Sequence, residues 1–160
     1  MKEIERTWLV GKMPSIRGIK KDKISQGYLS NKRNPLRIRQ KGKKFELTKK
    51  FDIASYDESV KEEINVLVSK EEFKKLWPLT VKSLEKIRYY FPLKNGLLAE
   101  MDVYQKELKG LVVVEVEFKS VEQMNSFVPP KWFDRDVTLE HWSGNAYLAG
   151  KNFKDIKKYL

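Results

Sequence analysis

The stretch from Val112 to Phe118, Val-Val-Val-Glu-Val-Glu-Phe, decides the fold class of this chain. Successive side chains of a β-strand point to opposite faces, so the four even-numbered positions form an unbroken apolar face. The odd-numbered face begins with Val113 and continues with Glu115 and Glu117. Carboxylates within so valine-rich a strand favour a charged face that is enclosed over one that is rinsed by solvent.

The same alternation recurs along the chain with both signs of charge. Acid-apolar-acid triplets occur at Glu3-Ile4-Glu5, Glu100-Met101-Asp102 and Glu115-Val116-Glu117. Basic triplets occur at Arg37-Ile38-Arg39 and Lys86-Ile87-Arg88, and the same spacing puts Thr48 with Lys50 and Lys61 with Glu63. The intervening positions are mostly apolar or bulky, so the predicted sheet has one charged face and one mostly apolar face.

Two interpretations of the charged face are open. In the first, it is an ordinary solvated surface over a core. In the second, the sheet curls into a barrel, helices cover the apolar outside, and the charges line the interior. Such an interior suits a multiply charged ligand with its counter-ion. Carboxylates two residues apart can bind Mg²⁺ or Mn²⁺, and arginine and lysine on facing strands can donate hydrogen bonds to phosphate oxygens.

Period-two patterning predicts most of the secondary structure. The candidate strands are Lys2–Val10, Ser25–Ser30, Leu36–Gln40, Lys44–Lys50, Val60–Val68, Ser83–Phe91, Leu97–Gln105, Leu111–Lys119 and Arg135–Glu140. Asn95-Gly96 is a tight-turn signal and favours an antiparallel meander from Ser83 to Lys119. The segment Gly11–Lys23 has the composition of a basic loop.

Three short helices complete the predicted elements. Ser69 and Glu72 form a capping box for Lys70–Trp77, and Ser120–Phe127 and Lys151–Leu160 are the other two. We therefore expect one domain over 1–160, of the α+β class but mainly β, with its C-terminal helix at 151–160. The short helices would pack outside a barrel or a strongly curved antiparallel sheet.

The composition narrows the classes of partner and site. A formal net charge of +11 over 160 residues points to an anionic partner. The basic loops lack interleaved aromatic residues, which disfavours nucleic acid. Without cysteine there are no disulfides or thiolate metal sites, and the lone His141 supports neither a catalytic triad nor a zinc site. We find no signal-peptide core or membrane-spanning run, so a cytoplasmic protein without membrane contact is expected.

Short motifs in order along the chain carry a resemblance to a known family. They are Glu3-Ile4-Glu5-Arg6, Gln26-Gly27-Tyr28-Leu29, Leu36-Arg37-Ile38-Arg39, Leu47-Thr48-Lys49-Lys50, Lys61-Glu62-Glu63, Glu85-Lys86-Ile87-Arg88-Tyr89, Glu100-Met101-Asp102-Val103, Val114-Glu115-Val116-Glu117-Phe118, Pro129-Pro130-Lys131-Trp132-Phe133, Asp136-Val137-Thr138, Asn145 and Leu148. This series resembles the CYTH family, the triphosphate tunnel metalloenzymes, and is most similar to its small bacterial members that hydrolyse inorganic tripolyphosphate. The resemblance implies an eight-stranded antiparallel barrel that forms a tunnel.

The resemblance also implies roles for the charged residues. The metal, Mg²⁺ or Mn²⁺, would be held among Glu3, Glu5, Glu63, Glu100, Asp102, Glu115 and Glu117. The triphosphate would be bound by Arg37, Arg39, Lys50, Lys61, Lys86 and Arg88. Catalysis would depend on Glu3, Glu5, Lys86, Arg88 and Glu117, with a water attacking a terminal phosphorus. A homodimer is left open.

Two positions depart from the family pattern. Thr7 stands where the family's opening motif ends in lysine, and Asn65 stands where its second acid on that strand is expected. Each lost charge-assisted hydrogen bond would cost about 1.5–3 kcal/mol. Three functions therefore stay open: a metal-dependent triphosphatase, a non-hydrolytic binder of polyphosphate or nucleotide, and a class IV adenylate cyclase.

Overall fold

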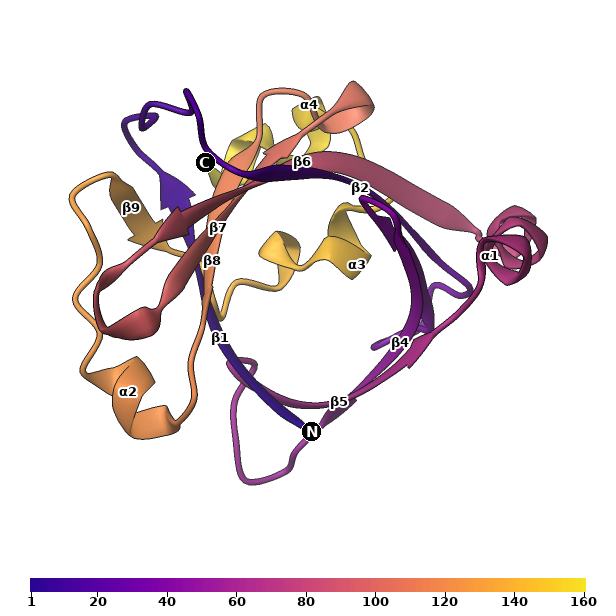
Figure 1. Ribbon diagram of the computed structural model, residues 1–160, viewed down its shortest axis with the longest axis horizontal. Helices are drawn as coiled ribbons and strands as arrows, with labels where there is room; N and C mark the ends of the chain where they lie inside the picture. The colour runs from indigo at the N-terminus through magenta and orange to yellow at the C-terminus, as the bar shows by residue number, and fades with distance from the viewer.

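A closed antiparallel β-barrel dominates the computed structural model, which describes residues 1–160 (Figure 1). Its strands are β1 (Lys2–Val10), β2 (Lys21–Tyr28), β3 (Arg37–Lys41), β4 (Lys44–Asp52), β5 (Val60–Leu67), β6 (Lys82–Pro92), β7 (Leu98–Tyr104) and β8 (Val112–Glu117), with a short β9 (Phe133–Asp136). The order around the sheet is β5-β4-β3-β2-β6-β7-β8-β1, and β5 pairs with β1 to close the ring. The barrel that the sequence predicts is therefore confirmed.

The first strand, β1, closes the ring, and its two halves pair with different strands. Residues Lys2–Ile4 pair with β5, whereas Trp8 and Val10 pair with β9 on the same edge of β1. The opposite edge pairs with β8 from Glu5 to Leu9. Where β5 diverges from β1, β9 pairs with the backbone of β1 in its place.

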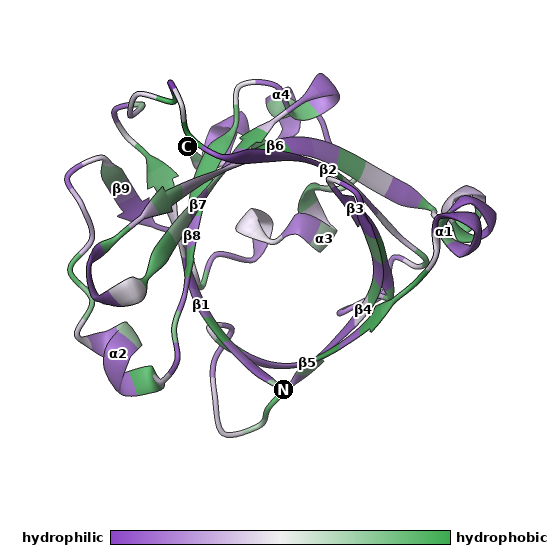
Figure 2. Ribbon diagram, in the orientation of Figure 1, coloured by the Kyte–Doolittle hydropathy of each residue, from purple (hydrophilic) through white to green (hydrophobic).

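Alternation along the strands separates an apolar outside from a charged inside. Trp8, Met101 and Val114 are almost fully buried on the outer face of β1, β7 and β8, together with Phe133. The neighbouring positions in sequence, which point inward, carry most of the acidic and basic triplets. Figure 2 shows the resulting bands of hydrophilic and hydrophobic residues along β6. This alternation of outward apolar and inward charged residues is typical of a barrel with a polar interior.

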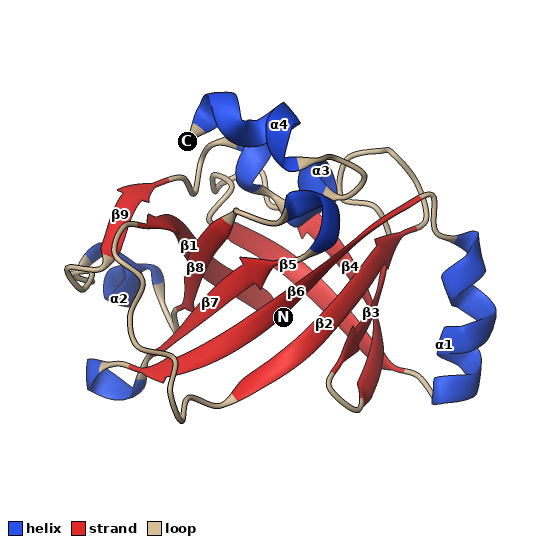
Figure 3. Cartoon of the chain, turned by 90° about the horizontal axis from the view of Figure 1, so that it is seen from above, coloured by secondary structure: helices blue, strands red, loops and turns tan.

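Short helices cover the barrel at the side and at one end (Figure 3). α1 (Lys70–Leu76) packs against β3 and β4 and begins with the expected capping box of Ser69 and Glu72. α2 (Val121–Asn125) covers β1. α3 (Asn145–Leu148) and α4 (Phe153–Ile156) lie at one end of the barrel. None of the helices is both long and apolar enough to cross a membrane.

Some elements differ from the sequence-based prediction. β2 begins at Lys21 instead of Ser25, because its polar first half pairs with the long strand β6. The ninth strand is Phe133–Asp136 instead of Arg135–Glu140, and the C-terminal helix is a single turn followed by a 3₁₀ turn. The tight turn is confirmed, since Asn95 and Gly96 adopt φ values of 59° and 70°.

α3 was not predicted, and it lies within the outline of the ring in Figure 1, across one mouth of the barrel. Leu148 and Ile156 are fully buried at this end, in a second apolar cluster with Leu9, Tyr104 and Val113. The chain after β9 therefore forms a plug whose apolar side packs against the barrel at this mouth. Its polar side contributes to the lining of the tunnel.

Candidate functional site

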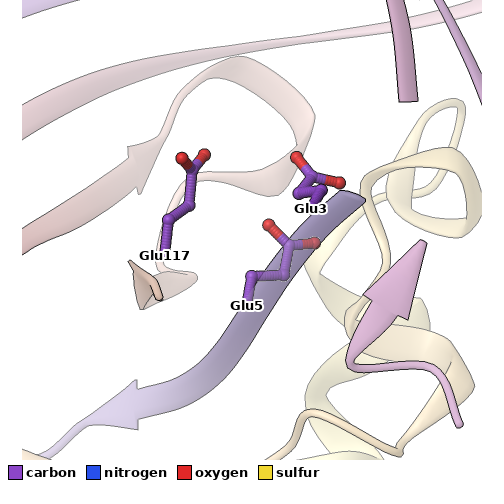
Figure 4. A group of neighbouring side chains, drawn as sticks. All are labelled: Glu3, Glu5 and Glu117. Atoms are coloured by element: carbon purple, nitrogen blue, oxygen red, sulfur yellow. The ribbon is translucent and has the colours of Figure 1, made fainter. Parts of the chain in front are cut away.

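Three glutamates converge on one point of the tunnel wall (Figure 4). Glu3 and Glu5 project from alternate positions of β1, and Glu117 projects from β8. The register pairs Glu5 directly with Glu117 across the two strands. One carboxylate oxygen from each of the three residues lies within 4.8 Å of the others. Like charges placed directly opposite destabilise a sheet, and a cation held among the three carboxylates would relieve this repulsion.

The electrostatics of the cluster support the same conclusion. Glu117 forms no ion pair, and burial together with Glu100 and Glu5 raises its pKa. Burial and the neighbouring Glu5 raise the pKa of Glu3 to about 8, even though Lys50 opposes the shift. Oxygen ligands of this kind suit Mg²⁺ or Mn²⁺, which keep several waters and take few carboxylates. The three glutamates could therefore hold one divalent ion.

Lys50 on β4 borders the carboxylate cluster. Its ammonium contacts Glu3 and lies 3.5 Å from Glu5 and 3.6 Å from Glu63. Although burial disfavours the charged form, Glu5 and Glu3 raise the pKa of Lys50. Lys50 thus partly neutralises the glutamates of β1 and β5, but it forms no ion pair with Glu117.

Arg88 organises the opposite wall. Its guanidinium donates two hydrogen bonds to Asp102, at 2.7 and 2.6 Å, and others to Glu100 and Glu115. Burial raises the pKa of Asp102, but Arg88 and Lys86 outweigh it and bring that pKa to about 2. These three acids are therefore paired with cationic side chains of the protein, whereas Glu117 of the carboxylate cluster has no such partner.

Lys86 connects this wall to the plug. Its ammonium contacts Asp102 and lies 3.0 Å from Oδ1 of Asn145 on α3. The hydroxyl of Tyr104 donates to the same Oδ1 at 2.7 Å. Two donors fix the amide orientation, so the Asn145 NH₂ group points away from them and is available to an acceptor in the tunnel. Sequence patterning placed Asn145 in a motif but assigned it no role.

The remaining predicted cations have different surroundings. Arg37 donates to Thr48 at 2.8 Å, and Arg39 forms an ion pair with Glu46 at 2.6 Å. Lys61 is engaged by Asp52 and Glu58, at 2.5 and 2.6 Å.

The structure thus brings Arg37, Lys50, Lys86 and Arg88 to facing walls of the tunnel, whereas Arg39 and Lys61 are occupied by acids that the sequence analysis did not single out. Of the seven predicted metal ligands, only Glu3, Glu5 and Glu117 form a cluster. The other four acids contact arginine or lysine, as described above.

The two departures from the family pattern occupy defined positions. Thr7 is buried, faces Glu115 across the β1–β8 pair, and is tied to Thr138 through its backbone N–H, at 3.0 Å. Asn65 accepts a hydrogen bond from Thr48 at 2.5 Å and donates to Glu63. The amide at 65 therefore links the Arg37–Thr48 contact to Glu63 through neutral groups and avoids a second anion beside Glu63.

A cavity of about 720 Å³ runs from these residues to the plugged mouth. Its inner part is lined by Glu5, Thr7, Arg37, Lys50 and Glu115, and Asn145 borders it from α3. The cavity brings Glu5 of the carboxylate cluster together with Arg37 and Lys50. This arrangement can hold a small polyanion together with a divalent cation.

Comparison with known proteins identifies a relative over almost the whole chain. The chain is 36% identical over 152 residues to the inorganic triphosphatase of Nitrosomonas europaea, a match that covers 93% of this chain and 97% of that protein. A scan against protein-family models finds no match.

Solved structures agree with this relationship. The inorganic triphosphatase NE1496 is 34% identical, with a TM-score of 0.66 over 92% of this chain and 93% of that one. HpAC1 from Hippeastrum, described as an adenylyl cyclase candidate with a dominant triphosphatase activity, superposes with a TM-score of 0.59 over 77% and 82% of the two chains; at 15% identity this likeness shows the fold alone. With a charged antiparallel tunnel and a relative that matches along its full length, the chain belongs to the CYTH family of triphosphate tunnel enzymes.

Proposed function

We propose that the protein hydrolyses inorganic tripolyphosphate to pyrophosphate and phosphate within the tunnel. One observation carries the proposal: three converging glutamates, of which Glu117 has no counter-ion and the other two share Lys50, lie in a tunnel that also presents arginine. A linear triphosphate with a divalent cation complements both halves of this arrangement. The inorganic triphosphatase relative supports the same substrate class.

In this proposal the three glutamates hold the metal. Glu3 and Glu5 offer oxygens from one strand and Glu117 offers one from its neighbour, so the ligands come from a rigid part of the barrel. The bound ion would neutralise phosphate charge and lower the pKa of a coordinated water. We propose Mg²⁺ or Mn²⁺, in line with the all-oxygen donor set.

The basic residues would bind and orient the chain of phosphates. Arg37 and Lys50 approach it from β3 and β4, and Lys86 and Arg88 approach it from β6. Because Arg88 already spans Glu100, Asp102 and Glu115, its position is fixed before substrate arrives, which lowers the entropic cost of binding. The water oxygen then attacks the terminal phosphorus while the bridging P–O bond breaks toward pyrophosphate.

The test is phosphate release from tripolyphosphate, ATP and thiamine triphosphate with Mg²⁺, with Mn²⁺ and with EDTA. We expect tripolyphosphate to be preferred and Glu5→Gln to lower kcat/KM at least about a hundredfold, as for loss of a metal ligand. Glu62→Gln is the matched control, since Glu62 is an exposed residue of β5 outside the cluster. Absence of release from all three substrates, or equal activity in Glu5→Gln, would refute the proposal.

Thr7 supports a second candidate, a binder of triphosphate without turnover. Its hydroxyl replaces a cation opposite Glu115, so the tunnel lacks one positive charge at the β1 wall. This candidate requires thermal stabilisation by tripolyphosphate without phosphate release, and Thr7→Lys should then create activity. Brisk turnover by the natural sequence excludes it. Formation of cyclic AMP from ATP would instead identify a cyclase. The cytoplasmic location and the homodimer stay predictions.

A further inference from the structure

Two lysines lie together at the plugged mouth of the tunnel. Lys82 at the start of β6 donates to the carbonyl of Ala146 at 2.5 Å, and Lys151 follows α3. Burial and the nearby Lys151 both lower the pKa of Lys82. Both lysines line the same cavity, where their like charges repel and an anion bound between them would relieve the repulsion.

No carboxylate neutralises these lysines. Neither Lys82 nor Lys151 forms an ion pair, and the nearby Lys32 forms none either. The other cations at this mouth are occupied, since Arg33 contacts Asp52 and Glu58. Seven side chains around the cavity are lysine or arginine and only four are glutamate. The cavity as a whole therefore carries a surplus of positive charge, and Lys32, Lys82 and Lys151 contribute to it without an acidic partner.

This basic mouth is continuous with the proposed triphosphate site. A single cavity contacts Arg37 and Lys50 inside the tunnel and Lys32, Lys82 and Lys151 at its opening. Thr7 lines the passage between the two parts. Because threonine is shorter than lysine, it leaves the passage open at the point where the family pattern has a long cation.

We propose that Lys32, Lys82 and Lys151 form a subsite for the phosphate groups beyond the third in a linear polyphosphate. The inference rests on the proposed function: the end of the chain would occupy the tunnel while the following phosphates lie between the lysines. These lysines then supply, farther along the bound polyphosphate, the positive charge that is missing at Thr7. A nucleoside triphosphate, which continues from its phosphates into an uncharged ribose, does not use this surplus of charge.

The experiment compares three substrates in one series of variants. Initial rates on tripolyphosphate, long-chain linear polyphosphate and ATP are measured for the natural protein and for Lys32→Gln combined with Lys151→Gln. We expect kcat/KM on long-chain polyphosphate to fall about tenfold and that on tripolyphosphate to change less than about twofold. Lys154→Gln is the matched control, because Lys154 is exposed on α4 and does not line the cavity.

Equal losses on tripolyphosphate and on the long chain would overturn the subsite, as would a loss confined to ATP or no loss at all. Affinities for the same three ligands, measured by calorimetry, distinguish failure of the proposed activity from failure of the subsite. If no substrate is hydrolysed, the proposed activity fails, but a weaker affinity of the double variant for the long chain alone still supports the subsite. If tripolyphosphate is hydrolysed and the long chain does not bind, only the subsite fails.

Discussion

Substitution of Glu117 by glutamine should have opposite effects on stability without and with metal. In the metal-free protein, the three carboxylates repel one another over distances of up to 4.8 Å. At that separation two unit charges interact by about 0.9 kcal/mol in water and about 3.5 kcal/mol at an effective dielectric constant of 20. Glu117 is in contact with solvent, so the lower part of this range applies. Glu117→Gln should therefore stabilise the metal-free protein by about 1 kcal/mol.

With metal the order should reverse. A divalent ion at about one hundred times its Kd stabilises the natural protein by about 2.7 kcal/mol. The variant keeps Glu3 and Glu5 but loses the ligand from β8, and a tenfold loss of affinity lowers this gain by about 1.4 kcal/mol. The variant should then be the less stable protein. A difference of 1 kcal/mol corresponds to about 2–4 °C in Tm for a chain of this size.

The assay is thermal unfolding at pH 8 in EDTA and in an excess of MgCl₂ or MnCl₂. We expect the Tm of Glu117→Gln to lie above that of the natural protein in EDTA and below it with metal. Glu62→Gln makes the same chemical change at an exposed site of β5, and its Tm should follow the natural protein in both conditions. The cluster is not a cation site if the Tm of Glu117→Gln lies on the same side of the natural protein's Tm in both conditions. The same holds if Glu62→Gln also changes from the higher to the lower Tm when metal is added.

The remaining predictions concern pH and packing. Metal-free protein should lose stability as pH rises from about 4.5 to about 8, because the raised pKa of Glu3 lets the folded state keep a proton that the unfolded chain has released; urea midpoints that rise over this range would contradict this. Arg88→Met leaves the fully buried Asp102 without its main partner and should cost about 3–5 kcal/mol in urea unfolding, against less than about 1 kcal/mol for the exposed Arg135→Met. Trp8→Ala empties a buried site between Phe127 and Phe133 and should cost about 3–5 kcal/mol; a cost below about 1 kcal/mol would show that this cluster is not part of the core.

Much of the barrel could be predicted from local patterns. Alternation places Glu3 and Glu5 on one face of β1 and Ile4 and Trp8 on the other, and the structure keeps this division. Capping residues and the Asn95-Gly96 turn mark their elements equally well, since each depends on groups a few residues apart. The first half of β2 was missed because its polar residues follow no hydrophobic period, and only pairing with β6 makes it a strand.

The grouping of charges was less predictable. The sequence places both Glu115 and Glu117 among the predicted metal ligands, but the register sets Glu117 against Glu5, whereas Glu115 contacts Arg88. Both lie on the same strand and the same face, so no pattern within β8 distinguishes them. The difference arises from where β1 and β6 pass on the two sides of the tunnel.

The sequence by itself determined the alternation of the strands, the sign of charge on each inward face and, through its motifs, the family. These properties depend on neighbours along the chain or on residue identity. Only the tertiary structure decided which acids cluster and that Glu117 among them has no cation of the protein as partner, because ring closure brings β1 beside both β5 and β8. It also decided that α3 and Asn145 cross the mouth of the tunnel, since the buried contacts of Leu148 with residues far away in sequence hold that short helix in place.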